Sequence, residues 1–400
     1  MRTYIDDLIE EMKTRGVDMP NPYTPGAGTK PSFLAGRDDI IKEVTEYIDE
    51  MLEGGCSRHT IFYGVRGVGK TVLLNKMEEI ASDRGIYNYH IECGEHTSLI
   101  EKLLLNSQKI LRSLKISEKL KSKLKEIISY FTASYNFSDN TFSFSVNSNA
   151  NSVVDLSQDL TDLFVTLGEA VRESGDSVIF FIDEIQSAEN RQLSAMIAAV
   201  HRINQLNLPL LIIGAGLPTI TRITGEAKSY SERLFHFIEI SYLSEKNAIS
   251  AIVEPALEYG VSYSDKALKK VINHTGCYPY FIQEFGYCLW GRLKEDKRFS
   301  EADVDSCYEE YIDKLDGSFY GARYNRSTKK EKEFLNAMLR CKKTPCSTAE
   351  IAKIMGKTQS SISPLRNHLI NKGLIYSPSQ GEVDFTVPHF DRYLKRLLNY

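Results

Sequence analysis

The residues whose types and spacing point most directly to chemistry lie in the segment GVRGVGKT, residues 64–71. This segment fits the pattern G-x-x-x-x-G-K-[ST], in which glycines let backbone N–H groups wrap a phosphate because no Cβ blocks the approach. An apolar run precedes it, and a helix is expected to begin at Lys70, so the helix dipole would favour an anion there. We expect Lys70 to bridge the β- and γ-phosphates of ATP and the Thr71 hydroxyl to bind Mg²⁺. The predicted nucleotide contacts in this loop are Gly64, Val65, Arg66, Gly67, Val68, Gly69, Lys70, Thr71 and Val72.

A pair of carboxylates follows a second apolar run, SVIFFIDEIQ. Asp183 and Glu184 would lie at the carboxyl edge of a parallel sheet, where ligands of such sheets bind. We expect Asp183 to hold Mg²⁺ through water and Glu184 to orient the water that attacks the γ-phosphate. A solvent-facing helix start is the alternative for Glu184. A small-molecule kinase has less need of a second carboxylate because its acceptor hydroxyl replaces the water, so the pair favours ATP hydrolysis.

Strands and helices must alternate along the chain to position these groups. Short apolar runs predict strands at 61–63, 86–92, 178–182, 210–213 and 237–240, with helices between them. Mostly unalternating strands are typical of a parallel sheet covered on both faces. The pattern predicts an α/β fold with an open parallel sheet.

Other segments do not follow this alternation of strands and helices. Residues 1–14 have the spacing of a short amphipathic helix, and a Pro- and Gly-rich arm leads to a helix that Asp38 could cap. Alternating aromatic and polar residues predict a hairpin insertion over about 130–152, which could pack on the core or form a tip for a partner. Residues 244–316 are expected to be entirely helical.

With these segments in this order, the chain resembles AAA+ P-loop ATPases, and within them the archaeal origin-recognition proteins and STAND signalling ATPases. FLAGRDDII, residues 33–41, resembles their adenine-binding segment, and GCYPYFIQ, residues 276–283, resembles the lid motif of the STAND branch. The resemblance implies that Tyr278 and Pro279 contact the nucleotide. It also implies that Arg233, in SERLFHFIEISYLSEKNA, is an arginine finger reaching a neighbouring subunit; a salt bridge at the rim is the alternative.

Two departures from the family pattern predict slow turnover. The segment GAGLP, residues 214–218, stands where the family places a polar γ-phosphate sensor, and it offers no side-chain donor before Thr219. The lid motif has Tyr278 and Pro279 where many AAA+ proteins have an arginine. Arg66 is expected to face solvent or a partner rather than the reacting phosphate.

The C-terminal segment has the sequence pattern of a winged helix-turn-helix. One helix would begin at Ser347 or Thr348, and a second would begin around Ser361 and run to Lys372, with Gly373 ending it in the left-handed conformation. A hairpin over LIYS and EVDFTV would form the wing. The exposed face of the second helix and the turn before it would present the predicted DNA contacts Lys357, Gln359, Ser360, Ser363, Arg366 and Asn367.

Charge is distributed unevenly along the 400 residues. Residues 326–400 contain 14 Lys and Arg against six Asp and Glu, a net charge of +8, so the first 325 residues carry −12. A basic module on an acidic body favours nucleic-acid contact, and a solvated helix surface is the alternative. The seven scattered cysteines include no C-x-x-C pair, and no apolar run reaches the ~18–20 residues of a membrane span, so we expect a cytoplasmic protein.

Together these features predict a P-loop NTPase core, a helical lid and a C-terminal winged helix. We expect an N-terminal helix and arm over 1–30, the ATPase core over 31–243, the lid over 244–325 and the winged helix over 326–400. The predicted function is a slowly hydrolysing ATP switch that couples ATP or ADP binding to double-stranded DNA, with homo-oligomerisation if Arg233 acts across subunits. A signalling ATPase whose winged helix and hairpin bind protein is the alternative.

Overall fold

The computed structural model describes residues 19–55, 57–94, 98–134 and 155–399, and the chain divides into two compact units. The sheet unit comprises residues 37–64 and 70–240. The C-terminal unit comprises the residues up to 36, residues 65–69 and residues 241–400. The division into four domains that the sequence suggests stays a prediction.

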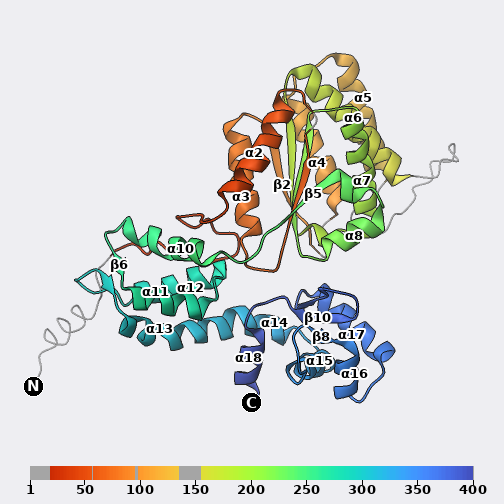
Figure 1. The fold of residues 1–400 in the computed structure, drawn as a ribbon. Helices are drawn as coiled ribbons and strands as arrows, with labels where there is room; N and C mark the ends of the chain where they lie inside the picture. Colours follow the sequence, from red (N-terminus) through yellow and green to blue (C-terminus); the bar gives the residue numbers. More distant parts are fainter. Residues whose placement is uncertain (1–18, 56, 95–97, 135–154, 400) are drawn as a thin grey trace, which may run out of the picture. The chain divides into compact units, whose positions relative to one another are not determined.

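Five parallel strands in the order β2–β3–β4–β1–β5 form the centre of the sheet unit (Figure 1). They are β1 (His59–Tyr63), β2 (Tyr87–Glu92), β3 (Val178–Asp183), β4 (Leu210–Gly216) and β5 (Phe235–Glu239). The parallel α/β sheet is therefore confirmed, with each strand within a few residues of its predicted position. Tyr63 pairs with Gly216 and Ile182 pairs with Gly214, so the segments that follow β1, β3 and β4 meet at one edge of the sheet.

Helices connect the strands and cover both faces of the sheet. They are α2 (Asp38–Leu52), α3 (Lys70–Asp83), α4 (Leu99–Ser113), α5 (Glu118–Ser134), α6 (Leu156–Ser174), the 3-10 turn η1 (Ile185–Ser187), α7 (Asn190–Gln205), α8 (Ile220–Ala227) and α9 (Ser231–Leu234). Figure 1 shows α2 and α3 on one face and α6 and α7 on the other. Phe164 of α6 stacks on Phe180 of β3 with ring centroids 5.9 Å apart. Covering both faces explains why every residue of β3 is buried.

Two details of the sheet unit differ from the prediction. Residues 130–134 complete helix α5, because buried Leu124, Ile128 and Phe131 continue a helical spacing, so the predicted hairpin cannot begin at 130. The rest of that hairpin lies outside the described residues, as does the predicted helix over 1–14. At the start of α2, Asp38 is the first helical residue, and the capping position is occupied by Arg37, whose side chain makes no capping bond.

The lid segment of the C-terminal unit is mainly helical. Its helices are α10 (Glu245–Leu257), α11 (Asp265–Thr275), α12 (Pro279–Trp290) and α13 (Glu301–Lys314), followed by the π-helical turn η2 (Leu315–Gly321) and α14 (Ala322–Asn325). The expectation of an entirely helical segment is wrong in one detail. Strands β6 (Ser262–Tyr263) and β7 (Arg298–Phe299) pair in parallel, since the loops before α11 and α13 run side by side.

The Pro- and Gly-rich arm packs on the lid helices within the same unit. The Tyr23 hydroxyl donates to the Ile252 carbonyl at 2.5 Å and lies 2.7 Å from the Tyr263 hydroxyl. A Cβ on Gly286 of α12 would lie 2.5 Å from the Tyr23 ring, so this glycine makes room for the arm. The arm is therefore an integral part of this unit.

The C-terminal module consists of three helices and a small sheet, followed by a last helix. The elements are α15 (Lys329–Leu339), β8 (Cys346–Ser347), α16 (Thr348–Ile354), α17 (Gln359–Asn371), β9 (Ile375–Tyr376), β10 (Glu382–Phe385) and α18 (Phe390–Leu397). The sheet is antiparallel in the order β8–β10–β9. Among the described residues, no helix has both the length and the apolar composition needed to cross a membrane.

Helix α17 begins two residues before the predicted position at Ser361, and Pro364 lies inside it. Thr358 caps this helix by accepting a hydrogen bond from the Ser361 N–H at 3.3 Å, and Ile362 is buried. These contacts stabilise a first turn that the missing N–H of Pro364 would otherwise disfavour. Gly373 follows the helix with φ 65°, as predicted for its left-handed position.

Candidate functional site

The phosphate loop joins strand β1 to helix α3, and its ends belong to the sheet unit. Lys70 begins α3, is 7% exposed, and donates from Nζ to the Gly64 carbonyl at 2.9 Å. The Gly64 N–H in turn donates to the Gly216 carbonyl at the end of β4, at 3.2 Å. Gly67 and Gly69 have φ angles of 83° and 96°, which favour glycine. The loop therefore has the backbone freedom that phosphate binding requires.

The two predicted magnesium ligands meet at the carboxyl edge of the sheet. The Thr71 hydroxyl donates to Asp183 Oδ2 at 2.7 Å, although the two residues are 112 positions apart in the chain. Asp183 ends β3 and is 6% exposed. Hydroxyl and carboxylate oxygens are the hard donors that Mg²⁺ takes from proteins, so this pair fits the expected ion.

Glu184 turns away from the direction of β3 in a left-handed conformation, with φ 49° and ψ 38°. That conformation costs a residue with a Cβ roughly 1–2 kcal/mol. Its N–H donates to Asp183 Oδ1 at 2.8 Å, and the Gln186 side-chain amide donates to its carboxylate. Glu184 is half-buried, so its side chain is fixed by a neighbour rather than simply facing solvent.

Gln186 lies beside the predicted site, and no motif in the sequence points to it. Its Oε1 accepts a hydrogen bond from the Leu217 N–H at 2.8 Å, and Leu217 directly follows β4. The side-chain amide therefore joins Glu184 to the segment where the predicted γ-phosphate sensor lies. The available signal was an amide residue two positions after Glu184, but only the pairing of β3 with β4 gives that spacing its meaning.

Cys93 is also close to the carboxylates. Its N–H donates to the Asp183 carbonyl at 3.0 Å, and its side chain is 3% exposed. Burial, reinforced by the charges of Asp183 and Glu184, raises the pKa of the Cys93 thiol to about 12. The thiol therefore stays protonated and is no nucleophile at neutral pH.

The tip of the phosphate loop, residues 65–69, groups with the C-terminal unit. The Tyr280 N–H donates to the Gly67 carbonyl at 3.3 Å. A Cβ on Gly67 would lie 2.6 Å from the Tyr278 hydroxyl, so any larger residue would collide with it. Tyr278 is fully buried, and no protein group in the described ranges bonds its hydroxyl. The predicted contact residue Tyr278 thus lies against the loop, and Pro279 occupies the first position of α12, which suits proline.

Arg66 and Arg323 lie near each other in the C-terminal unit. Burial, followed by the positive charge of Arg66, lowers the pKa of Arg323. Arg66 is half-buried, with Nε 2.7 Å from the position that a Cβ on Gly373 would take. Gly373 therefore leaves space for the Arg66 side chain, and the expectation that Arg66 faces solvent or a partner rather than the reacting phosphate stays a prediction.

Arg233 lies on the short helix α9, immediately before β5, and its side chain is exposed. An exposed guanidinium is accessible to a neighbouring subunit. Its role as an arginine finger stays a prediction.

The predicted DNA contacts lie on or beside α17, and most of them are exposed. These are Lys357, Gln359, Ser360, Ser363 and Asn367. Arg366 differs, because it is half-buried and donates from Nη2 to the Ser377 hydroxyl at 2.8 Å. The nearby Lys372 donates to Glu331 at 2.7 Å. Part of the positive charge of this face is therefore bonded within the module.

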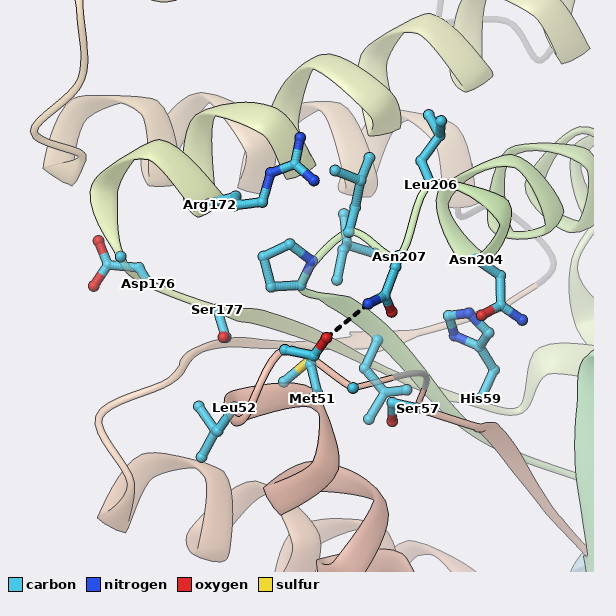
Figure 2. A pocket seen from close by; sticks show the side chains of 17 residues that line it. Met51, Leu52, Ser57, His59, Arg172, Asp176, Ser177, Asn204, Leu206 and Asn207 are labelled. Carbon is cyan, nitrogen blue, oxygen red and sulfur yellow. Dashed lines mark hydrogen bonds between the residues drawn. The ribbon is translucent and has the colours of Figure 1, made fainter.

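A separate pocket of about 360 Å³ lies at the opposite, amino edge of the sheet (Figure 2). Its wall includes His59 and Leu210, which begin β1 and β4, and the ends of α2, α6 and α7. Figure 2 shows Asn207 donating to the Gly54 carbonyl, a bond of 2.7 Å. Burial lowers the pKa of His59 to about 3, and its Nδ1 accepts from the Ile212 N–H at 3.0 Å, so this histidine is neutral and structural. The pocket is distinct from the phosphate loop.

Two parts of the chain match known sequence families. Residues 34–213 match the sequence profile of the AAA ATPase domain family. This region, 180 of the 400 residues, is similar to that family and is called the AAA ATPase domain below. Residues 317–394 match a second family, described as a domain of unknown function (DUF8462). No match is found among curated proteins.

Solved structures of other proteins are similar to this chain over most of its length. The chain is similar to the Walker-type ATPase PABY2304 of Pyrococcus abyssi, with a TM-score of 0.55, 14% identity, and coverage of 93% of this chain and 98% of that one. A weaker likeness is to the Thermotoga maritima RuvB Holliday junction branch migration motor, with a TM-score of 0.44, 14% identity, and coverage of 92% of this chain and 95% of that one. Another is to the Aeropyrum pernix Orc1 protein in complex with DNA, with a TM-score of 0.42, 15% identity, and coverage of 92% of this chain and 94% of that one. At this level of identity the likeness to the P. abyssi protein shows a P-loop ATPase fold.

Proposed function

We propose that the AAA ATPase domain binds ATP with Mg²⁺ and hydrolyses it slowly, and that the bound nucleotide governs how the C-terminal module meets DNA. The observation that carries the first part is the 2.7 Å bond between Thr71 and Asp183, next to the buried Lys70. It brings a hydroxyl, a carboxylate and an ammonium group to the mouth of a glycine loop.

Each of these residues has a distinct role in the proposed reaction. Lys70 donates to phosphate oxygens, and Thr71 and Asp183 would hold Mg²⁺, which when bound neutralises the charge of the phosphates. Glu184 accepts a hydrogen bond from the attacking water and takes its proton as the water oxygen bonds to the γ-phosphorus. The bond from phosphorus to the β–γ bridging oxygen breaks, leaving ADP and inorganic phosphate.

Slow turnover is proposed because of the end of β4. The segment 214–218 contributes the Leu217 N–H, which is already bonded to Gln186, rather than a side-chain donor for the γ-phosphate. Fewer donors aimed at the developing charge mean less stabilisation of the transition state.

The ATPase proposal is tested with Glu184→Gln and a matched control, Glu189→Gln. Glu189 is an exposed residue five positions further along the chain. We expect Glu184→Gln to bind ATP with parental affinity in calorimetry while phosphate release falls roughly 10²-fold or more. Glu189→Gln should behave as the parent. Hydrolysis by Glu184→Gln at the parental rate would refute the assignment of the water-positioning residue.

For DNA we propose that the C-terminal module is a winged helix that uses the exposed face of α17. The net charge of +8 over residues 326–400 supports a phosphate-binding surface. Gel-shift titrations of random duplex across a salt series, with and without ATP, test this proposal. Absence of binding even at low salt with ATP would refute it.

A protein-binding module is the second candidate. The internal bonds of Arg366 and Lys372 support it, since they reduce the charge available to phosphates. Under this alternative the module does not bind DNA at any salt concentration.

The proposed homo-oligomer, with Arg233 reaching a neighbour, is tested by measuring the mass of Arg233→Ala and of the parent in solution with ATP.

A further inference from the structure

We propose that Gln186 is a positioning residue for hydrolysis: its side-chain amide aims the Glu184 carboxylate and ties it to the end of β4. This inference rests on the proposed ATPase function and adds a residue to it. Gln186 makes two hydrogen bonds in opposite directions, one to Glu184 and one to Leu217.

The orientation of this amide is determined by its partners. A backbone N–H can only donate, so the Leu217 N–H at 2.8 Å requires Oε1 of Gln186 on its side. Nε2 must then face Glu184, whose carboxylate accepts. A rotation of the amide by 180° would place two donors together at Leu217, so the donor to Glu184 is held in place.

Close packing at the end of β4 keeps the amide there. A Cβ on Gly216 would lie 2.8 Å from Gln186 Oε1 and 3.0 Å from Ile185 Cγ2. Glycine at position 216 therefore leaves the space that the amide fills. Replacing it by alanine would push Gln186 away from both of its partners.

The same glycine connects this arrangement to the phosphate loop. The Gly216 carbonyl accepts from the Gly64 N–H at 3.2 Å, and the Gly64 carbonyl accepts from Lys70 at 2.9 Å. A continuous series of bonds thus runs from Lys70 through the ends of β1 and β4 to Gln186, and from there to Glu184. Movement of the loop on binding phosphate would be transmitted to the carboxylate that positions water.

A preorganised carboxylate also explains the backbone of Glu184. Its left-handed conformation is unfavourable for a residue with a Cβ, and the bonds to Asp183 and Gln186 compensate for it. The Gln186 amide also lies beside the segment 214–218, which has no side-chain hydrogen-bond donor.

The test uses two variants that disturb the amide in different ways. Gln186→Glu keeps the shape, and in its ionised form it can still accept from Leu217 but cannot donate to Glu184. Gly216→Ala displaces the amide without changing it. Matched controls are Gln158→Glu, since Gln158 makes a similar amide-to-carboxylate bond to Asp162 on the exposed side of helix α6, and Gly225→Ala, whose new Cβ would meet nothing closer than 3.7 Å.

We expect both test variants to lower kcat at least about tenfold. In Gln186→Glu, KM and ATP affinity should change by less than about twofold, and the melting temperature by less than a few degrees. Both controls should retain the parental kcat. A parental kcat in Gln186→Glu would overturn the proposal, and so would losses of affinity and thermal stability in parallel with kcat, because they indicate a structural role. A parent that binds or hydrolyses no ATP would refute the proposed function itself, which is a different outcome.

Discussion

Removing one buried hydroxyl should make this protein more stable and a weaker nucleotide binder at the same time. The change is Tyr278→Phe. The hydroxyl is buried against Gly67 and is bonded by no protein group in the part of the chain that the structure describes, while the ring packs on Phe281 at 4.6 Å and on Tyr242 at 5.5 Å. Phenylalanine keeps the ring contacts and removes only the polar atom.

The magnitude follows from the cost of an unsatisfied polar group. A buried hydroxyl without a partner costs about 1–3 kcal/mol, so the variant should gain up to that amount in the free energy of unfolding without nucleotide. For a unit of this size the melting temperature would rise by roughly 2–4 °C per kcal/mol. If a phosphate oxygen supplies the missing partner when ATP binds, the variant should bind ATP roughly tenfold more weakly.

Tyr280→Phe is the matched control with the opposite expectation. The hydroxyl of Tyr280 has hydrogen-bond partners in Glu284 and Ser318, and burial raises its pKa to about 12. Losing those bonds should cost about 1 kcal/mol and lower the melting temperature. Thermal unfolding and calorimetric titration with ATP measure both effects. A melting temperature that falls in Tyr278→Phe as it does in Tyr280→Phe would refute the reasoning about stability, and unchanged ATP affinity would remove Tyr278 from the nucleotide site.

Three further predictions concern the phosphate loop and the C-terminal module. Lys70→Ala should lose at least about tenfold in ATP affinity by calorimetry, whereas Lys76→Ala should retain it, since the half-buried Lys76 of α3 pairs with Glu79. Burial would raise the pKa of Glu331, but bonds from Lys372 and from the Thr328 N–H outweigh it and hold that pKa below its ordinary value. The contribution of Glu331 to stability is therefore present above the ordinary glutamate pKa and is lost as pH falls through the lowered pKa. Glu331→Ala should cost roughly 2 kcal/mol in the free energy of unfolding at neutral pH. The melting temperatures of the variant and the parent should converge in acid. Lys357→Ala should weaken DNA binding and reduce the slope of log affinity against log salt by about one, unlike Lys395→Ala on α18, and an unchanged slope would mean that Lys357 touches no phosphate.

The sequence alone was sufficient to predict an element wherever the residues that form it are close together in the chain. The loop 64–71 needs glycines at set positions, and β3 needs an unbroken apolar run, so both are visible without any knowledge of the rest of the chain. The start of α17 was predicted two residues too late, because a proline and a capping threonine act in opposite directions and their balance depends on the burial of Ile362.

The amino-acid sequence by itself determined the phosphate loop, the acidic end of β3 and the α/β class, because each depends on residue types within a few positions of one another. Only the tertiary structure decided which strand lies beside β3, and with it that Gln186 reaches both Glu184 and Leu217, 31 positions away. The physical reason is that strand order and close packing are set by contacts between distant segments. An amide's partners are therefore known only once those segments have been brought together.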